Sequence, residues 1–216
     1  MTRSTTLLVL SLTKIKEKTL VLHTLSPDFG RRSFICSTGR SVPMALFLPL
    51  SILDAEVVEN PKSELWRLRG ISSLHPLNSV RSNMYKNTIA MFMSEVLYRC
   101  IKDGDGADGL FAWAEKTVLT LEGLENDFSN YHLRFLLELA SLLGFRPSDE
   151  DLAPFVGEHL RDVRSLLNLS LAESMLLPLN GKSRGEIAEA LLRYISHHTE
   201  SNLNVQSLGV LSEVFR

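Results

Sequence analysis

Three aspartates alternate with glycines between Asp103 and Asp108, in a pattern that resembles a calcium-binding loop. An EF-hand loop needs oxygen ligands at its first, third and fifth positions and a bidentate Glu at its twelfth. Counted from Asp103, the fifth position is Ala107 and the twelfth is Ala114. The segment therefore predicts a flexible acidic turn, and calcium binding is not expected.

The remaining metal-ligating and nucleophilic residues form no recognisable site. The cysteines, Cys36 and Cys100, stand far apart in apolar stretches, so we expect buried thiols and no cysteine-based zinc site. No two of the six histidines have the i, i+4 spacing of a helical metal site, and no phosphate-binding loop or Gly-x-Ser-x-Gly motif occurs. The sequence thus predicts a protein that is not an enzyme and that carries neither a metal nor a cofactor.

Positive charge gathers at the start of the chain. Residues 1–40 hold seven Lys and Arg against two Asp and Glu, whereas residues 81–216 hold 13 against 19, a net charge of −6. A basic region joined to an acidic one indicates an anionic partner for the first, although a solvated basic strand face would show the same balance. The residues that we expect to contact nucleic-acid phosphates are Lys14, Lys16, Lys18, Arg31, Arg32 and Arg40.

The overall composition is that of a folded globular protein. The chain has 216 residues, of which 44% are hydrophobic and 22% charged. No apolar run approaches the roughly 20 residues that span a bilayer. The short apolar run 7–12 is followed by lysines and not by a small-residue cleavage site, so it does not resemble a signal peptide. A cytoplasmic protein without a membrane segment is the expectation.

The first 78 residues show the pattern of short strands separated by turns. Strands are expected at 7–12, 19–25, 33–37, 48–58 and 65–71. No helical pattern intervenes, so a five-stranded OB-fold barrel fits this length. Four aromatic residues, Phe29, Phe34, Phe47 and Trp66, offer surfaces for base stacking, although a barrel this small uses most of its aromatics in its core.

Residues 79–216 show helical periodicity instead, which predicts an all-α second domain. Helices are expected from residue 79 to 100, at 110–121 and at 128–143, where Gly144 and Pro147 would end the third helix. The spacings Ser170-x-x-Glu173 and Ser183-x-x-Glu186 predict capping boxes at two further helix starts. A last helix is expected over 204–215.

Taken together, these elements and several local segments resemble the RecO family of bacterial recombination mediators over nearly the whole chain. The segments that carry the resemblance are residues 24–34, 87–98, 130–139, 142–147, 193–197 and 208–211. The sequence departs from the family in two respects. Only Cys100 lies in the helical part, where some members hold zinc with four cysteines, and a single arginine, Arg40, stands where many members have a longer basic run.

The resemblance implies binding of single- and double-stranded DNA, annealing of complementary strands, and cooperation with RecR in loading RecA onto DNA coated by single-strand-binding protein. It also implies a non-enzymatic protein that works at the bacterial nucleoid during repair and contacts the acidic C-terminal tail of the single-strand-binding protein. A tail of that kind needs a cation beside an apolar pocket. Our candidates are Arg134 and Arg146, which stand next to Phe135 and Phe145.

Two other readings stay open on the sequence alone. The chain would be a protein-binding scaffold if its barrel had weak or no nucleic-acid binding, as the single arginine in the third loop suggests. It would be an enzyme acting on nucleic acid if carboxylates converged on a metal, although no pair has a recognisable spacing.

Overall fold

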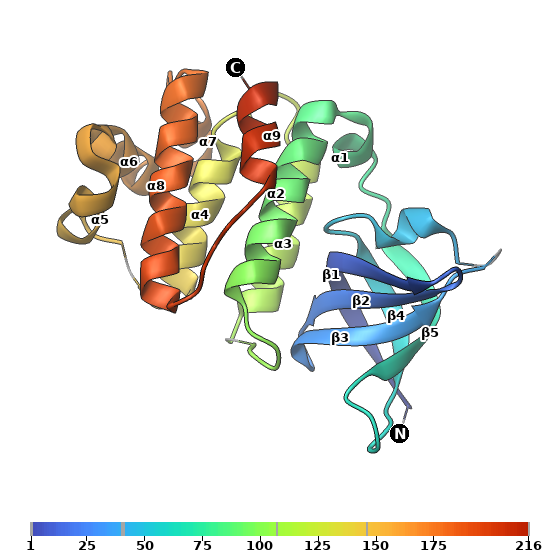
Figure 1. The fold of residues 1–216 in the computed structure, drawn as a ribbon. Coiled ribbons are helices and arrows are strands. Elements are labelled where there is room, and N and C mark those ends of the chain that lie inside the picture. The colour runs from blue at the N-terminus through green and yellow to red at the C-terminus, as the bar shows by residue number, and fades with distance from the viewer. Residues whose placement is uncertain (1, 40–41, 107, 146, 216) are drawn as a thin grey trace. The chain divides into compact units, whose positions relative to one another are not determined.

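The computed structural model describes residues 2–39, 42–106, 108–145 and 147–215 (Figure 1). These residues fall into two compact units that interleave along the chain. One comprises Met1–Asn78 and Ile101–Leu119, and the other comprises Ser79–Cys100 and Thr120–Arg216. We call them the barrel unit and the helical unit. The expected architecture, an N-terminal five-stranded barrel followed by helices, is confirmed.

The barrel closes in the order β1-β2-β3-β5-β4. Its strands are β1 (Thr2–Lys16), β2 (Thr19–Ser26), β3 (Gly30–Ser37), β4 (Ile52–Val58) and β5 (Trp66–His75), with a short 3₁₀ helix η1 (Met44–Phe47) before β4. Neighbouring strands are antiparallel except β3 and β5, which run parallel through the pairs Phe34–Trp66 and Ile35–Arg67. Strand β1 closes the barrel because its first half pairs with β4 and its second half with β2.

Alternation of apolar residues along the strands builds the barrel core. Leu7 and Val9 of β1, Leu20 and Leu22 of β2, and Phe34 of β3 are all fully or almost fully buried. Residues two apart on a strand face the same side, so each strand contributes a row of side chains to one interior. The aromatic side chains of Phe34 and Phe47 belong to this interior and are unavailable for base stacking.

Strands β1, β3 and β5 extend beyond the apolar runs that predicted them, and the extensions of β1 and β3 move several cations onto strands. Strand β1 continues to Lys16 and therefore includes Lys14, although the expected strand ended at residue 12. Strand β3 begins at Gly30, so Arg31 and Arg32 lie on the strand itself and not in the turn before it. The sequence pattern missed these extensions because polar side chains at a barrel's end face solvent and break the apolar alternation.

The helical unit is built from helices between residues 78 and 214. They are α1 (Asn78–Ser82), α2 (Met84–Cys100), α3 (Leu110–Gly123, which begins in the barrel unit), α4 (Tyr131–Leu142), α5 (Asp149–Val156), α6 (Leu160–Asn168), α7 (Leu171–Met175), α8 (Gly181–Thr199) and α9 (Ser207–Val214), with a 3₁₀ turn η2 (Gly157–His159). None of the helices in the described ranges is long and apolar enough to cross a membrane.

One of the two expected capping boxes is confirmed and the other is wrong. Ser170 and Glu173 cap each other's backbone at the start of α7. Helix α8, however, begins at Gly181, where the Asn180 side chain accepts a hydrogen bond from the Ser183 backbone N–H. Asn is as good an N-cap as Ser, and the earlier start adds a turn of backbone hydrogen bonds. Helices α5 and α6 were not anticipated from the sequence.

The two cysteines are buried free thiols, as expected from their apolar surroundings. Cys36 belongs to the barrel core, where burial raises the pKa of its thiol to about 11. A thiol with so high a pKa forms little thiolate at neutral pH and is chemically inert.

Candidate nucleic-acid interface

A polar ladder crosses three strands on the outside of the barrel. The Nε2 atom of His23 on β2 lies 3.0 Å from Oγ1 of Thr13 on β1, and its Nδ1 lies 2.8 Å from Oγ of Ser33 on β3. Burial lowers the pKa of His23, the positive charge of Arg31 lowers it further, and Asp103 opposes them. The imidazole is therefore neutral at pH 7, with one nitrogen donating and the other accepting.

A hollow of about 660 Å³ adjoins this ladder. Its lining includes Thr13, Ile15, His23, Arg32 and Leu65. Ile15 and Leu65 are exposed apolar side chains at 50% and 38%. Two acidic residues, Glu64 and Asp103, also line the hollow, so its apolar walls and hydroxyl groups suit a nucleobase better than a phosphate.

The three lysines expected to contact phosphate lie together at one end of the barrel. Lys14 pairs with Leu20 and Lys16 with Thr19, so both stand near the tip of the β1–β2 hairpin, and Lys18 lies in its turn. All three side chains are exposed. Exposed ammonium groups on one hairpin can approach an anionic backbone without losing internal contacts.

Arg31 is placed differently from the lysines. Its side chain is only 12% exposed, and its Nη1 atom forms an ion pair of 2.5 Å with Oδ1 of Asp103. The backbone holds the same contact, because Arg31 N–H donates to the Asp105 carbonyl and Gly104 N–H donates to the Arg31 carbonyl. The acidic turn that resembled a calcium loop thus packs against β3 and neutralises an expected phosphate ligand.

Arg32 stacks on an aromatic ring. Its guanidinium carbon lies 3.5 Å from the centroid of the Trp66 ring, and Nη2 donates to the Glu64 carbonyl at 3.5 Å. Trp66 in turn meets Phe29 edge to face, with ring centroids 5.6 Å apart. The Trp66 ring is half-buried and already covered by a cation, so a base would meet the guanidinium plane before it met the indole.

Two further cations of the barrel were missed by sequence reasoning. Arg67 and Arg69 are exposed on β5, on either side of the buried Leu68. Their alternation with Leu68 was the available signal, since residues two apart share the outer face of a strand. Arg40, the remaining candidate, lies outside the described residues.

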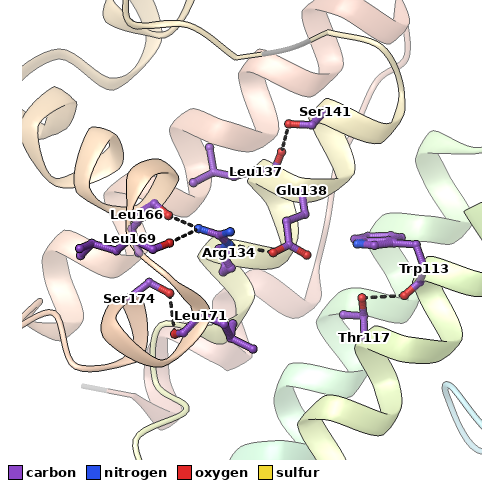
Figure 2. A network of polar contacts seen from close by, with 10 residues as sticks. All are labelled: Trp113, Thr117, Arg134, Leu137, Glu138, Ser141, Leu166, Leu169, Leu171 and Ser174. Carbon is purple, nitrogen blue, oxygen red and sulfur yellow. Dashed lines mark hydrogen bonds and ion pairs between the residues drawn. The ribbon is translucent and has the colours of Figure 1, made fainter.

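The partner-binding candidate Arg134 is engaged inside the helical unit (Figure 2). Its Nε donates to Glu138 at 2.7 Å, and its Nη1 donates to the carbonyls of Leu166 and Leu169 at the end of α6. These contacts tie α4 to α6 and leave the side chain only 20% exposed. Arg146 lies outside the described residues.

Comparison with known proteins identifies the family. The family model for the C-terminal part of recombination protein O matches residues 81–151. A Flavobacterium johnsoniae protein named DNA repair protein RecO is 30% identical, over 96% of this chain and 97% of its own length. A protein of the same name from Phocaeicola vulgatus is 28% identical, over 91% of this chain and 97% of its own. A third from Bacteroides fragilis is 31% identical, over 70% of this chain and 64% of its own. The chain therefore belongs to the RecO family.

Proposed function

We propose that this protein is a DNA repair and recombination mediator that binds single- and double-stranded DNA through the outer surface of its barrel. Residues 1–78 hold the DNA in this proposal, and residues 79–216 dock protein partners. The protein acts without catalysing a covalent step and works in the cytoplasm, at the nucleoid during repair. Membership of a family whose curated relatives are named DNA repair protein RecO supports this role.

The observation that carries the proposal is that the barrel unit holds both a group of exposed lysines at the β1–β2 hairpin and a hollow on its outer surface. Lys14, Lys16 and Lys18 at the hairpin supply charge for the phosphate backbone, and the hollow beside His23 and Arg32 accepts a base. Other proteins that bind single-stranded DNA combine a basic groove for the phosphate backbone with planar side chains on which the bases stack.

The finer activities follow from the family and belong to the same proposal. They are annealing of complementary strands and, with RecR, loading of RecA onto DNA coated by single-strand-binding protein. We propose that the helical unit receives the acidic tail of that coating protein. Because Arg134 already has partners inside its unit, the tail site depends on Arg146. Arg146→Ala should weaken binding of a fluorescent tail peptide and leave oligonucleotide binding unchanged; wild-type peptide binding by this variant would place the tail site elsewhere.

Single-stranded DNA binding across a salt series tests the central claim. Each phosphate contact to a single strand contributes a slope of about −0.7 to log K against log salt, so four to six contacts give roughly −3 to −4. The triple variant Lys14→Ala/Lys16→Ala/Lys18→Ala should reduce the steepness by about 2. Arg31→Ala should change it little, because Asp103 already pairs with that guanidinium.

A matched control removes three exposed cations from the helical unit, in the variant Arg161→Ala/Lys182→Ala/Arg193→Ala. It loses the same net charge and should retain the wild-type slope. If the affinity of the wild-type protein for single-stranded DNA did not change with salt, the alternative would be favoured: a protein-binding scaffold whose barrel does not bind nucleic acid. That alternative is supported by the contacts that Arg31 and Arg32 already make within the barrel unit, to Asp103 and to the Trp66 ring.

A further inference from the structure

A second cluster of chemically capable side chains belongs to the helical unit, and it shares no residue with the proposed DNA surface. Glu158 and His159 belong to the turn η2, and Glu186 belongs to α8. One possible ligand atom from each of the three lies within 4.8 Å of the others. The Nε2 atom of His159 stands 3.0 Å from Oε2 of Glu186. Among the described residues, no other group of three His, Cys, Asp or Glu side chains meets that condition.

Local structure holds the trio in place. Gly157 ends α5 with a positive φ of 53°, so the chain turns there and presents the next two residues. A left-handed backbone of this kind favours glycine, which has no Cβ to clash. Beside Glu186 on α8, Ile187 and Ala188 are completely buried, which anchors that part of the helix.

Carboxylates flank both nitrogens of the His159 imidazole, and Nε2 is hydrogen-bonded to Glu186. Its second nitrogen, Nδ1, faces the carboxylate of Asp162 on α6 at 3.9 Å, which is longer than a hydrogen bond. Histidines that bind metals through one nitrogen commonly direct the other at a carboxylate, which fixes the ring and its tautomer. The His159 side chain is 15% exposed, whereas those of Asp162 and Glu186 are about 43% and 42% exposed. The ring is thus held in position while solvent reaches the oxygen ligands.

We propose that Glu158, His159 and Glu186 bind a divalent transition-metal ion, with Asp162 orienting the imidazole and water completing the coordination. One imidazole and two carboxylates form a ligand set that suits Zn²⁺, and an imidazole disfavours Mg²⁺ and Ca²⁺. Lys182 lies 3.6 Å from the Glu186 carboxylate, but its side chain is 83% exposed and can move away. The bound ion links η2 to α8 and stabilises the helical unit.

The sequence pattern predicted no metal site because two of these ligands are far apart along the chain. His159 and Glu186 are 27 positions apart and lie on separate elements, so they form no short sequence motif. The packing of α5, which η2 follows directly, against α8 is what brings them together.

Zinc binding by the full chain tests the proposal independently of DNA. Protein freed of metal with a chelator is titrated with ZnCl₂ by calorimetry, and its thermal unfolding is followed with and without Zn²⁺. We expect one high-affinity Zn²⁺ per chain and a rise in Tm. His159→Asn, Glu186→Gln and Glu158→Gln should each weaken binding at least tenfold and abolish the rise. Asp162→Asn should weaken binding about tenfold through the orientation of the ring.

Matched controls separate this site from general affinity for zinc. Glu189→Gln removes an exposed carboxylate one turn further along α8, and His197→Asn/His198→Asn removes the exposed imidazoles near the end of that helix. Both should bind Zn²⁺ as the wild type does. Glu158 is exposed, so Glu158→Gln also reports on binding if the other variants fold poorly. The proposal is overturned if the wild type gains neither stoichiometric zinc nor stability, or if the site variants bind like the controls.

Discussion

Arg31 on strand β3 and Asp103 in the acidic turn are 72 positions apart in sequence and form an ion pair of 2.5 Å. Hydrogen bonds between the backbones of residue 31 and residues 104 and 105 flank this pair. A segment with the composition of a metal-binding loop therefore serves as a cover for the start of β3. Its carboxylates lie on the same unit as the cations that we expect to meet DNA.

Removing the Asp103 charge should strengthen DNA binding. In Asp103→Asn the Arg31 guanidinium keeps its charge and loses its counterion, so the potential on the barrel becomes more positive. One unit charge at 4 Å contributes about 1 kcal/mol in bulk water, which corresponds to roughly fivefold in Kd at low salt. Fluorescence anisotropy with a single-stranded oligonucleotide at low and high salt measures the effect, which should fade as salt screens it.

Asp105→Asn is the appropriate comparison for that variant. Asp105 contacts Arg31 through its backbone carbonyl, so its side chain can change without breaking the ion pair. If Asp105→Asn strengthens binding as much as Asp103→Asn, the effect comes from net charge alone and Arg31 has no specific part in it.

A substitution at Gly30 should loosen the same cover. A Cβ at Gly30 would lie 2.5 Å from the Asp105 carbonyl oxygen, and the φ of this residue is +59°. Left-handed strain of about 1–2 kcal/mol and a clash of about 1–3 kcal/mol predict that Gly30→Ala lowers the free energy of unfolding by roughly 2–5 kcal/mol. Gly109→Ala shares the positive φ, at +82°, but meets nothing within 4 Å. Urea unfolding should therefore show the smaller loss of about 1–2 kcal/mol for Gly109→Ala.

Arg134→Ala should act on stability. The guanidinium donates to Glu138 and to two carbonyls at the end of α6, and its loss leaves those carbonyls without that donor (Figure 2). Hydrogen bonds from a charged group contribute about 1.5–3 kcal/mol, so the free energy of unfolding should fall by about 2–3 kcal/mol. Arg161→Ala removes an exposed arginine of α6 and should stay within about 0.5 kcal/mol of wild type. Equal stability of the two variants would contradict a structural role for Arg134.

His132 should make stability depend on pH. The ring is completely buried, and burial, with the positive charge of Arg184, lowers its pKa from 6.5 to about 3. The unfolded chain therefore takes up a proton at a higher pH than the folded one, and stability present above pH 6.5 is lost as the pH falls toward 3. The slope is about 1.4 kcal/mol per pH unit, or about 2 kcal/mol between pH 7 and pH 5.

His132→Phe is the reference for that slope. Phe suits the surroundings, because the ring of Phe92 lies 5.9 Å and that of Phe215 lies 6.3 Å from the imidazole. The variant lacks the titrating group, whereas His23 is common to both proteins and cancels. Parallel pH profiles of the variant and the wild type would show that His132 does not titrate as proposed.

The sequence determined the type of most secondary-structure elements, but it did not determine which side chains contact one another. The alternation of apolar and polar residues, as at Leu7, Val9, Leu20 and Leu22, predicted the strands of the barrel. The spacing of apolar residues three and four positions apart predicted α2 and α4. Both signals are local, because a strand or a helix face repeats within a few residues. The Ser170–Glu173 capping box was readable for the same reason.

Contacts between distant segments were decided by the tertiary structure alone. The sequence placed Arg31 and Lys16 in one basic cluster, yet the fold pairs Arg31 with Asp103 and leaves Lys16 exposed. Arg134 stood beside an aromatic residue in sequence, but the packing of α4 on α6 gives its guanidinium to backbone carbonyls. The sequence determines the type and charge of each residue. Whether a charged side chain forms an ion pair depends on contacts between elements that are many residues apart, and local sequence patterns do not predict those contacts.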